Sequence, residues 1–328
     1  FVSEGTLDVP EDADVVRVSD ARQALAQISA AFFGFPQRDV TIIGVTGTKG
    51  KTTVAETACS VMNRMGLACG VIGSNGAAYA GKHVGTSNTT PESYELMRLF
   101  RAMRDEGVRY VVMEVSSHAL VQHRVEGLDF SVAAFTNLTQ DHLDYHHTME
   151  EYRSAKERLF HQCRRAVLNL DDEAGRWYRE RLACPVFTYS ENKDQADLTA
   201  KGIRLYPGQV EFEAVAREQI QRVFLPIPGG FTIYNALCAL SVGLCLGLRL
   251  SECAAALRSA RGVKGRVEVV PVPTAYTVLI DYAHSPNALE NILLTARDFT
   301  AGRLICLFGC GGDRDRTKRP IMGGVVKE

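Results

Sequence analysis

Apolar runs alternate with longer amphipathic stretches through the first half of the chain. The run at 40–45 predicts a short buried strand, and the stretch after it, which ends near Gly66, has helical spacing. Further strands are expected at 67–72, 110–115, 132–135 and 166–170, and helices at 91–106 and 149–163. Strands that alternate with helices need crossover connections, so the pattern predicts an α/β fold with a mostly parallel sheet covered on both faces.

The pattern changes in the second half of the chain. Short alternating stretches within 196–225, separated by Pro207-Gly208, predict a hairpin or a small antiparallel edge of the sheet. Two helices are expected next, at 231–246 and 251–260. Glycines at 262 and 265 then suggest a linker before a new unit of strand, helix and strand, expected at 276–281, 287–298 and 303–308.

The composition is that of an ordinary globular protein and excludes a disordered or collagen-like chain. Among 328 residues, 46% are hydrophobic and 23% are charged. Thirty-seven Lys and Arg residues against 38 Asp and Glu residues give a net charge of −1, so no overall basic field favours nucleic acid or anionic lipid. We therefore expect small-molecule partners, and any phosphate must be bound by a few local groups.

Three further features predict a cytoplasmic protein without a membrane span. The nine cysteines contain no C-x-x-C pair, which favours buried free thiols in a reducing compartment over disulfides or a metal site. No secretory signal is visible at the start of the chain. The charge-free segment 231–248 contains Thr232, Asn235 and Ser241, so we expect a buried helix there.

A glycine-rich turn between the first predicted strand and helix carries the strongest chemical signal. It reads Gly44-Val-Thr-Gly47-Thr-Lys-Gly50-Lys51-Thr52-Thr53 and resembles a phosphate loop, although Val45 stands where the usual pattern has its first glycine. Backbone N–H groups and the start of the following helix would surround phosphate oxygens. Lys51 would reach the terminal phosphates, and Thr52 would bind Mg²⁺.

Two polar segments at the ends of later strands are candidates for metal binding. Glu114 ends the strand at 110–115, where a carboxylate is costly unless it meets a cation, although a salt-bridged loop residue is the alternative. The segment 136–147 contains His142, His146 and His147, and a neutral histidine can bind a metal. Spacing does not choose among these three histidines, and they could also be ordinary loop residues.

Lys156 lies at the edge of the apolar face of the helix expected at 149–163. It stands four residues from both Tyr152 and Phe160. Helical spacing alone favours a lysine that extends to solvent or pairs with a nearby glutamate. A desolvated lysine, however, loses its proton and becomes a nucleophilic amine.

The last strands of the chain also lead into polar segments. One is followed by Asp281 and His284, and the other by a glycine-rich basic segment that contains Arg314, Arg316, Lys318 and Arg319. The basic cluster suits carboxylate or phosphate recognition, with a solvated turn as the alternative. A dinucleotide fingerprint is excluded because Arg314 takes the place of its final glycine.

Taken together, these motifs resemble the Mur ligase family of ATP-dependent amide-bond ligases in peptidoglycan synthesis. The resemblance covers nearly the whole chain and is strongest to the member that adds the third amino acid of the peptide. It rests on segments 46–53, 88–91, 113–118, 135–146, 265–268, 281–286 and 309–315, and on Asn235.

The resemblance implies three domains. Residues 1–38 would be a remnant of an N-terminal uridine-binding domain and its linker, 39–262 the central ATP-binding ligase domain, and 263–328 the truncated start of a Rossmann-like, amino-acid-binding C-terminal domain. A chain built in this way is expected to be poorly stable or inactive by itself. The complete protein is expected to be a cytoplasmic monomer.

The implied reaction joins meso-diaminopimelate or L-lysine to UDP-MurNAc-L-Ala-D-Glu through an acyl phosphate, using ATP and two Mg²⁺ ions. The segment that selects between the two amino acids would lie beyond Glu328. Alternatives are a folylpolyglutamate or cyanophycin type of ligase, which would not bind a uridine nucleotide, and a P-loop regulatory NTPase, which would not need an amino acid.

The resemblance also assigns residues. Lys51, Glu114, His142 and Lys156 would be catalytic, and Thr52, Glu114, His142 and Lys156 would hold Mg²⁺, with Lys156 carbamylated by CO₂ to N6-carboxylysine. The residues placed around ATP would be Gly47, Thr48, Lys49, Gly50, Lys51, Thr52, Thr53, Asn235, Arg266 and Asp281. Those placed around the UDP-muramoyl-dipeptide would be Asn88, Thr89, Thr90, Ser116, Gln122 and Arg124, and Arg314 would meet the incoming amino acid.

Overall fold

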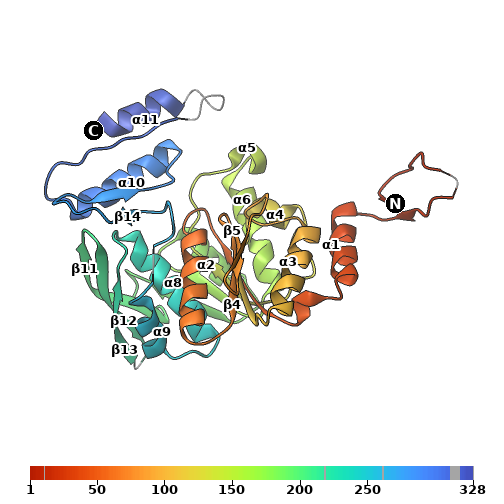
Figure 1. Ribbon diagram of the computed structural model, residues 1–328, viewed down its shortest axis with the longest axis horizontal. Coiled ribbons are helices and arrows are strands. Elements are labelled where there is room, and N and C mark those ends of the chain that lie inside the picture. The colour runs from red at the N-terminus through yellow and green to blue at the C-terminus, as the bar shows by residue number, and fades with distance from the viewer. Residues whose placement is uncertain (11, 218, 261, 311–317, 328) are drawn as a thin grey trace.

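A large twisted sheet forms the centre of the computed structural model, which describes residues 1–10, 12–217, 219–260, 262–310 and 318–327 (Figure 1). The sheet has 11 strands in the order β13-β12-β11-β10-β9-β8-β3-β7-β4-β5-β6. The strands from β11 to β4 in this order pair in parallel, as the sequence pattern predicts. Their bounds are β3 Thr41–Thr46, β4 Cys69–Gly73, β7 Tyr110–Glu114, β8 Phe130–Phe135, β9 Ala166–Asn169, β10 Val186–Ser190 and β11 Leu198–Tyr206.

Both edges of the sheet are antiparallel. β12 (Gln209–Ala216) and β13 (Gln219–Leu225) pair with β11 at one edge, where the sequence predicts a hairpin. β5 (Gly76–Tyr79) and β6 (Lys82–Val84) extend β4 at the other edge, which the sequence analysis did not predict. These strands have only four and three residues, which is too short for a clear alternation of apolar and polar positions.

Helices cover both faces of the sheet, and the side chains of β3 show how. Ile43 and Val45 pack into one apolar cluster with α2, α8 and α9, and Ile42 packs into a second cluster on the opposite face, with α3 and α7. The helices are α1 Ala21–Phe32, α2 Lys51–Arg64, α3 Ser93–Asp105, α4 Ser117–Val121, α5 Leu143–His146, α6 Met149–Glu157, α7 Glu173–Arg179, α8 Phe231–Cys245, α9 Leu250–Leu257, α10 Pro286–Phe299 and α11 Lys318–Lys327, with short 3₁₀ helices at Pro36–Arg38 and Arg158–Gln162.

Two of the predicted helices form, one of them with a change of helix type near its end. The helix expected at 149–163 is α-helical only to Glu157, and Arg158–Gln162 continue it as a 3₁₀ helix. The charge-free segment 231–248 forms α8, whose Thr232, Asn235 and Ser241 are buried. In the described part of the chain, no helix has the length and apolar character to cross a membrane.

The chain termini contain less regular structure. β1 (Val2–Ser3) and β2 (Val16–Arg17) pair on an extension that leads away from the body (Figure 1). Near the other end, β14 (Glu268–Val270) pairs antiparallel with β15 (Val278–Ile280), followed by α10 and α11. The strand expected at 303–308 is wrong, because this segment pairs with no strand and the side chain of Leu307 is 99% exposed.

Candidate active site

The phosphate-loop segment connects β3 to α2 at the carboxyl edge of the parallel strands. Gly47 has a φ of 145° and Gly50 has a φ of 84°, both in the region that glycine favours. A Cβ on Gly47 would overlap Thr136 Oγ1, and a Cβ on Gly50 would come within 2.6 Å of Asn235 Oδ1. The glycines therefore allow the residue that follows β8 and the helix α8 to approach the loop closely, and Asn235 of α8 lies beside the loop.

Lys51 begins α2 and folds back over the loop. Its Nζ donates hydrogen bonds to the carbonyl oxygens of Gly47 (3.0 Å) and Thr48 (2.9 Å). Burial lowers the pKa of the Lys51 amine, while Glu114 and Asp141 oppose that shift. A cation held here, beside the first amides of a helix, is positioned to meet phosphate oxygens.

Arg266 and Asp281 come from the segment that contains β14 and β15. Arg266 contributes to the lowered pKa of Lys51, which places its charge within electrostatic reach of the loop. Its guanidinium also lies 4.8 Å from the centre of the Tyr282 ring. Asp281 Oδ2 accepts a hydrogen bond from the Val267 amide at 2.9 Å and so fixes the backbone next to Arg266.

Glu114 is a buried carboxylate at the end of β7, with an exposed fraction of 1%. It accepts hydrogen bonds from the amide of Ser74 (2.7 Å) and from the Ser74 hydroxyl (3.4 Å). Glu114 takes part in none of the ion pairs among the described residues. Glu114 is therefore not the salt-bridged loop residue that was the alternative. Burial raises the pKa of Glu56, and the negative charge of Glu114 contributes to this shift.

These donors fit a magnesium ion. Thr52 and Glu114 supply oxygen atoms, which Mg²⁺ prefers, and Mg²⁺ is commonly held by one or two carboxylates together with phosphates and water. In the described residues there is no group of three or more His, Cys, Asp or Glu side chains that could hold a metal by themselves. A Mg²⁺ ion here would therefore depend on phosphate oxygens as well as on protein ligands.

The segments expected to hold the peptide substrate lie together next to Glu114. The Thr90 hydroxyl donates to the Glu114 carbonyl oxygen (2.9 Å) and accepts from the Ser116 amide (3.0 Å). Arg124 donates to the Thr90 carbonyl oxygen (3.0 Å) and to Gln122 Oε1 (2.7 Å). Thr89 contacts Ser74 through their hydroxyls (3.1 Å), and Asn88 precedes it in the same loop.

Two of these residues also have structural roles. Ser116 caps α4, because its hydroxyl accepts from the Ala119 amide. Arg124 forms an ion pair with Glu92 at 2.9 Å. Arg314 lies outside the described residues.

The three candidate histidines differ sharply in their surroundings. His146 is buried, and its Nε2 lies 2.8 Å from the Ser117 hydroxyl. His142 is exposed at the edge of the cluster and packs edge to face against His118, and His147 is also exposed. Burial lowers the pKa of His118, of His142 and, to about 4, of His146, so these imidazoles are neutral near pH 7.

Tyr152 connects this cluster to the phosphate loop, a role that the sequence analysis missed. Its ring stacks on His146 with centroids 5.0 Å apart, and its hydroxyl lies 3.3 Å from Thr48 Oγ1. Helical spacing indicated only that Tyr152 faces the core, because its partner Thr48 is far away in sequence. No local signal could have identified this contact.

The Lys156 side chain points into the protein. Helical spacing favoured an amine at solvent or paired with a glutamate, and that prediction is wrong. Its exposed fraction is 1%, and its Nζ donates to the Gly47 carbonyl oxygen at 2.9 Å. The amine also lies 4.3 Å from the centre of the Tyr152 ring. Burial, followed by the charge of Lys51, lowers the pKa of Lys156 well below its usual value, which favours a neutral amine.

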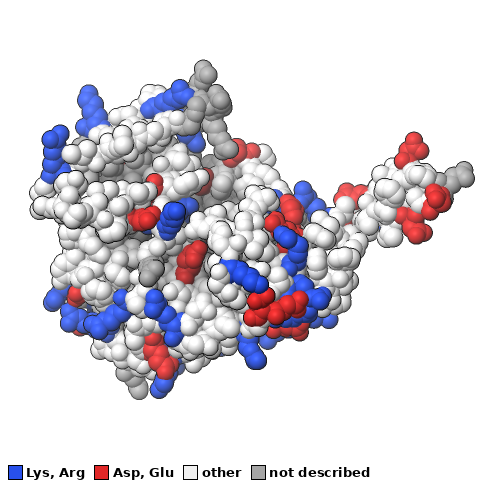
Figure 2. Space-filling view, in the orientation of Figure 1, with Lys and Arg blue, Asp and Glu red and all other residues white. Residues whose placement is uncertain are grey.

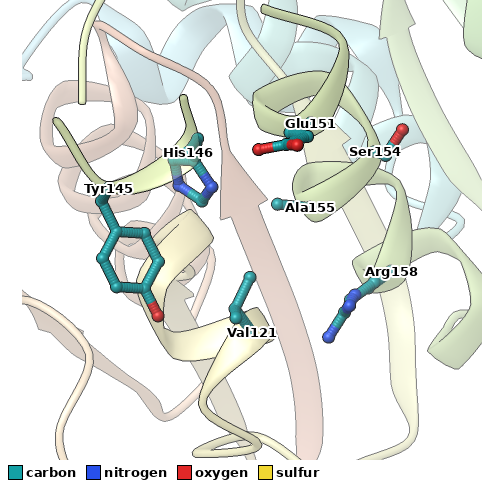
Figure 3. A pocket seen from close by; sticks show the side chains of 7 residues that line it. All are labelled: Val121, Tyr145, His146, Glu151, Ser154, Ala155 and Arg158. Carbon is teal, nitrogen blue, oxygen red and sulfur yellow. The ribbon is translucent and has the colours of Figure 1, made fainter. Parts of the chain in front are cut away.

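A cavity of about 400 Å³ lies beside this cluster (Figure 3). Tyr145 and His146 lie on one side of it, and Glu151, Ser154 and Arg158 of α6 and the turn that follows lie on the other. Figure 2 shows basic and acidic side chains interspersed over one face of the molecule, in keeping with the net charge of −1. Binding of an anion therefore depends on individual basic side chains at the site, such as Lys51 and Arg124.

A glycine-rich loop between a parallel strand and a helix, with an inward lysine and a carboxylate on the neighbouring strand, defines a P-loop nucleotide-binding protein of the α/β class. Residues 45–243 match the Mur ligase middle domain, and residues 265–328 match the glutamate ligase domain of Mur ligases. The chain belongs to the Mur ligase family.

Similar proteins support this assignment. A Clostridium botulinum protein named UDP-N-acetylmuramoyl-L-alanyl-D-glutamate–2,6-diaminopimelate ligase is 44% identical over 96% of the chain and 65% of its own length. A Geobacillus thermodenitrificans protein of the same name is also 44% identical, over 98% of the chain and 67% of its own length. The chain thus spans about two thirds of the length of these relatives.

Solved structures show the same fold. A ligase structure with the same name superposes with a TM-score of 0.82 and 30% identity, over 99% of the chain and 67% of that structure. A Mycobacterium tuberculosis folylpolyglutamate synthase complexed with ADP and AMPPCP has a TM-score of 0.69 at 20% identity, over 84% of the chain and 70% of that structure. The second likeness concerns the fold alone.

Proposed function

We propose that the protein is an ATP-dependent ligase that joins meso-diaminopimelate, as the third amino acid, to UDP-MurNAc-L-Ala-D-Glu. One observation carries the proposal: the phosphate loop, Glu114 and the loop around Thr90 lie next to one another at one edge of the sheet. The names of the relatives favour diaminopimelate over L-lysine. The reaction would belong to peptidoglycan synthesis and hence to cell-wall growth.

In this proposal the γ-phosphoryl group of ATP moves to the terminal carboxylate of the dipeptide and ADP leaves. The amine of the incoming amino acid then attacks the acyl phosphate, phosphate leaves and the amide bond forms. Lys51 stabilises negative charge on the phosphoryl oxygens, and the first amides of α2 bind phosphate. Arg124, held against Thr90 and Gln122, orients the substrate carboxylate.

Mg²⁺ would neutralise phosphate charge during the transfer. Thr52 and Glu114 would hold one ion, and His142 and a modified Lys156 would hold a second. Both His142 and Lys156 lie against the Tyr152 ring, with the ring centroids of His142 and Tyr152 6.1 Å apart. The neutral imidazole of His142 leaves a nitrogen lone pair free for a cation.

We propose that the Lys156 amine reacts with CO₂ to form a carbamate. The amine nitrogen would form a bond to the carbon of CO₂ and release one proton, which leaves an anionic N6-carboxylysine. Carbamate formation requires a neutral amine, and the burial of Lys156 supports that state. The anion would meet a Mg²⁺ ion next to the phosphate loop.

The central ligase domain would comprise residues 39–262, preceded by the segment 1–38 and followed by the C-terminal segment 263–328. The end of α9 at Leu257 and the start of β14 at Glu268 support the second boundary. We also propose a cytoplasmic monomer. The nine free cysteines suit a reducing compartment.

The product tests this function. The full-length protein is purified and incubated with ATP, Mg²⁺ and UDP-MurNAc-L-Ala-D-Glu, and with diaminopimelate, L-lysine or L-glutamate in separate arms. Mass spectrometry should find the UDP-MurNAc-tripeptide in the diaminopimelate arm. A tripeptide only in the lysine arm would change the amino acid, and ligation to a folate in place of the uridine nucleotide would support the folylpolyglutamate alternative.

A further inference from the structure

Asn137 follows β8 and lies against Lys49, in the middle of the phosphate loop. Its side chain makes two hydrogen bonds to the backbone of Lys49. Asn137 Oδ1 accepts from the Lys49 amide at 2.9 Å, and Asn137 Nδ2 donates to the Lys49 carbonyl oxygen at 3.1 Å. The side-chain amide of Asn137 therefore binds both the N–H group and the carbonyl group of Lys49.

The neighbours of Asn137 extend this connection. The Thr48 amide donates to the Asn137 carbonyl oxygen (2.8 Å), and the Thr136 hydroxyl donates to the Lys49 carbonyl oxygen (2.6 Å). The Thr139 amide donates to Thr48 Oγ1 (3.0 Å). The segment itself is fixed from behind, because the Leu138 amide donates to Asp172 Oδ2 (2.9 Å).

These contacts determine which amides can meet a phosphate. Thr48 and Lys49 direct their N–H groups to Asn137, so those two donors are used within the protein. The first three amides of α2, at Lys51, Thr52 and Thr53, have no partner within the helix. The orientation of the peptide groups ahead of α2 therefore decides how these three amides face a bound anion.

We propose that Asn137 is a positioning residue of the nucleotide site. Its side-chain amide clamps Lys49 and holds the phosphate loop in the shape that binds the phosphates of ATP. This inference rests on the proposed nucleotide-binding function and adds a residue for which the sequence pattern gave no role.

The chain contains a matched control. Asn63, near the end of α2, makes the same two-armed contact with Cys69: its Oδ1 accepts from the Cys69 amide and its Nδ2 donates to the Cys69 carbonyl oxygen, both at 2.9 Å. Asn63 lies about 18 Å from Lys51 along the helix axis. Removing either asparagine deletes the same kind of clamp, but only one clamp touches the phosphate loop.

The experiment measures Mg·ADP binding by calorimetry and thermal unfolding for the wild type, Asn137→Ala and Asn63→Ala. Both variants should lower the unfolding midpoint by similar amounts. Only Asn137→Ala should also weaken ADP binding, by about tenfold, as expected for the net loss of about one hydrogen bond's contribution. Equal ADP affinity in all three proteins, or equal weakening in both variants, would overturn the inference.

A second variant covers the case in which Asn137→Ala does not fold. Asn137→Leu keeps a similar size and adds no charge, but it can make neither hydrogen bond to Lys49. Its ADP affinity should also fall by about tenfold. Wild-type affinity in Asn137→Leu would overturn the inference, and failure of the wild type to bind ADP would overturn the proposed function as well.

Discussion

Lys156 shows how burial changes what one side chain can do. From helical spacing it was expected at solvent or beside a glutamate, yet its amine lies against Gly47 and the Tyr152 ring. The resemblance to Mur ligases, and not the spacing, suggested a chemical role. Local periodicity places a residue near the apolar face of a helix, but the contact with Gly47 depends on a segment distant in sequence.

Replacing Lys156 by alanine should lower ligase turnover by about a hundredfold or more, because the carbamate that would support Mg²⁺ is lost. Added bicarbonate or acetate should restore part of the activity in Lys156→Ala but not raise that of the wild type. Lys201→Ala, on the exposed part of β11, is the control and should turn over normally. Normal turnover of Lys156→Ala would show that the carbamate role is wrong.

The buried His146 should make the stability of the protein depend on pH. Burial lowers its pKa from 6.5 to about 4, so the unfolded chain binds the proton more tightly than the folded chain does. The stability that neutral His146 contributes is complete above about pH 6.5 and is lost as the pH falls toward about 4, by at most about 3 kcal/mol.

Urea unfolding between pH 7 and pH 4 measures this effect. His146→Phe cannot titrate and should lose less stability over that range than the wild type, whereas His147→Asn, at an exposed neighbour, should follow the wild type. If the wild type and His146→Phe lose equal stability, His146 does not control this part of the pH dependence.

At the scale of elements, the strand, phosphate loop and helix at β3 and α2 were predictable, because an apolar run, a glycine-rich turn and helical spacing follow one another in the chain. The strand expected at 303–308 was not formed, since apolar alternation produces a strand only where a neighbouring strand supplies hydrogen bonds. β5 and β6 were missed because they are short. The contacts of Asn137, His146 and Tyr152 join distant segments, which no local pattern reveals.

Close packing of α7 against β9 provides an element-scale prediction. A Cβ on Gly175 would overlap the backbone carbonyl oxygen of Asn169. Gly175→Ala should therefore reduce the free energy of unfolding by about 1–3 kcal/mol, although alanine is the better helix former.

Gly324 in α11 is the control, because a Cβ there meets no atom within 4 Å. Gly324→Ala should leave stability unchanged or raise it by up to about 1 kcal/mol. Urea unfolding compares the two variants. A Gly175→Ala protein as stable as the wild type would show that α7 does not pack tightly against the strand.

At the scale of the whole molecule, the sheet gathers functional side chains from distant parts of the chain. The parallel strands β3, β7 and β8 end at one edge, which brings the phosphate loop, Glu114 and the segment after Phe135 together. A net charge of −1 is compatible with anionic substrates because Lys51 lies at the phosphate loop and Arg124 lies at Thr90, within the candidate site. The fold class followed from the sequence pattern, whereas the substrate was suggested by the family resemblance.

Phosphate release from ATP tests the central claim most directly. The full-length ligase should release phosphate only when UDP-MurNAc-L-Ala-D-Glu and diaminopimelate are both present, and Lys51→Ala should abolish the release. Phosphate release at the same rate without the amino acid would contradict a ligase and support a P-loop regulatory NTPase.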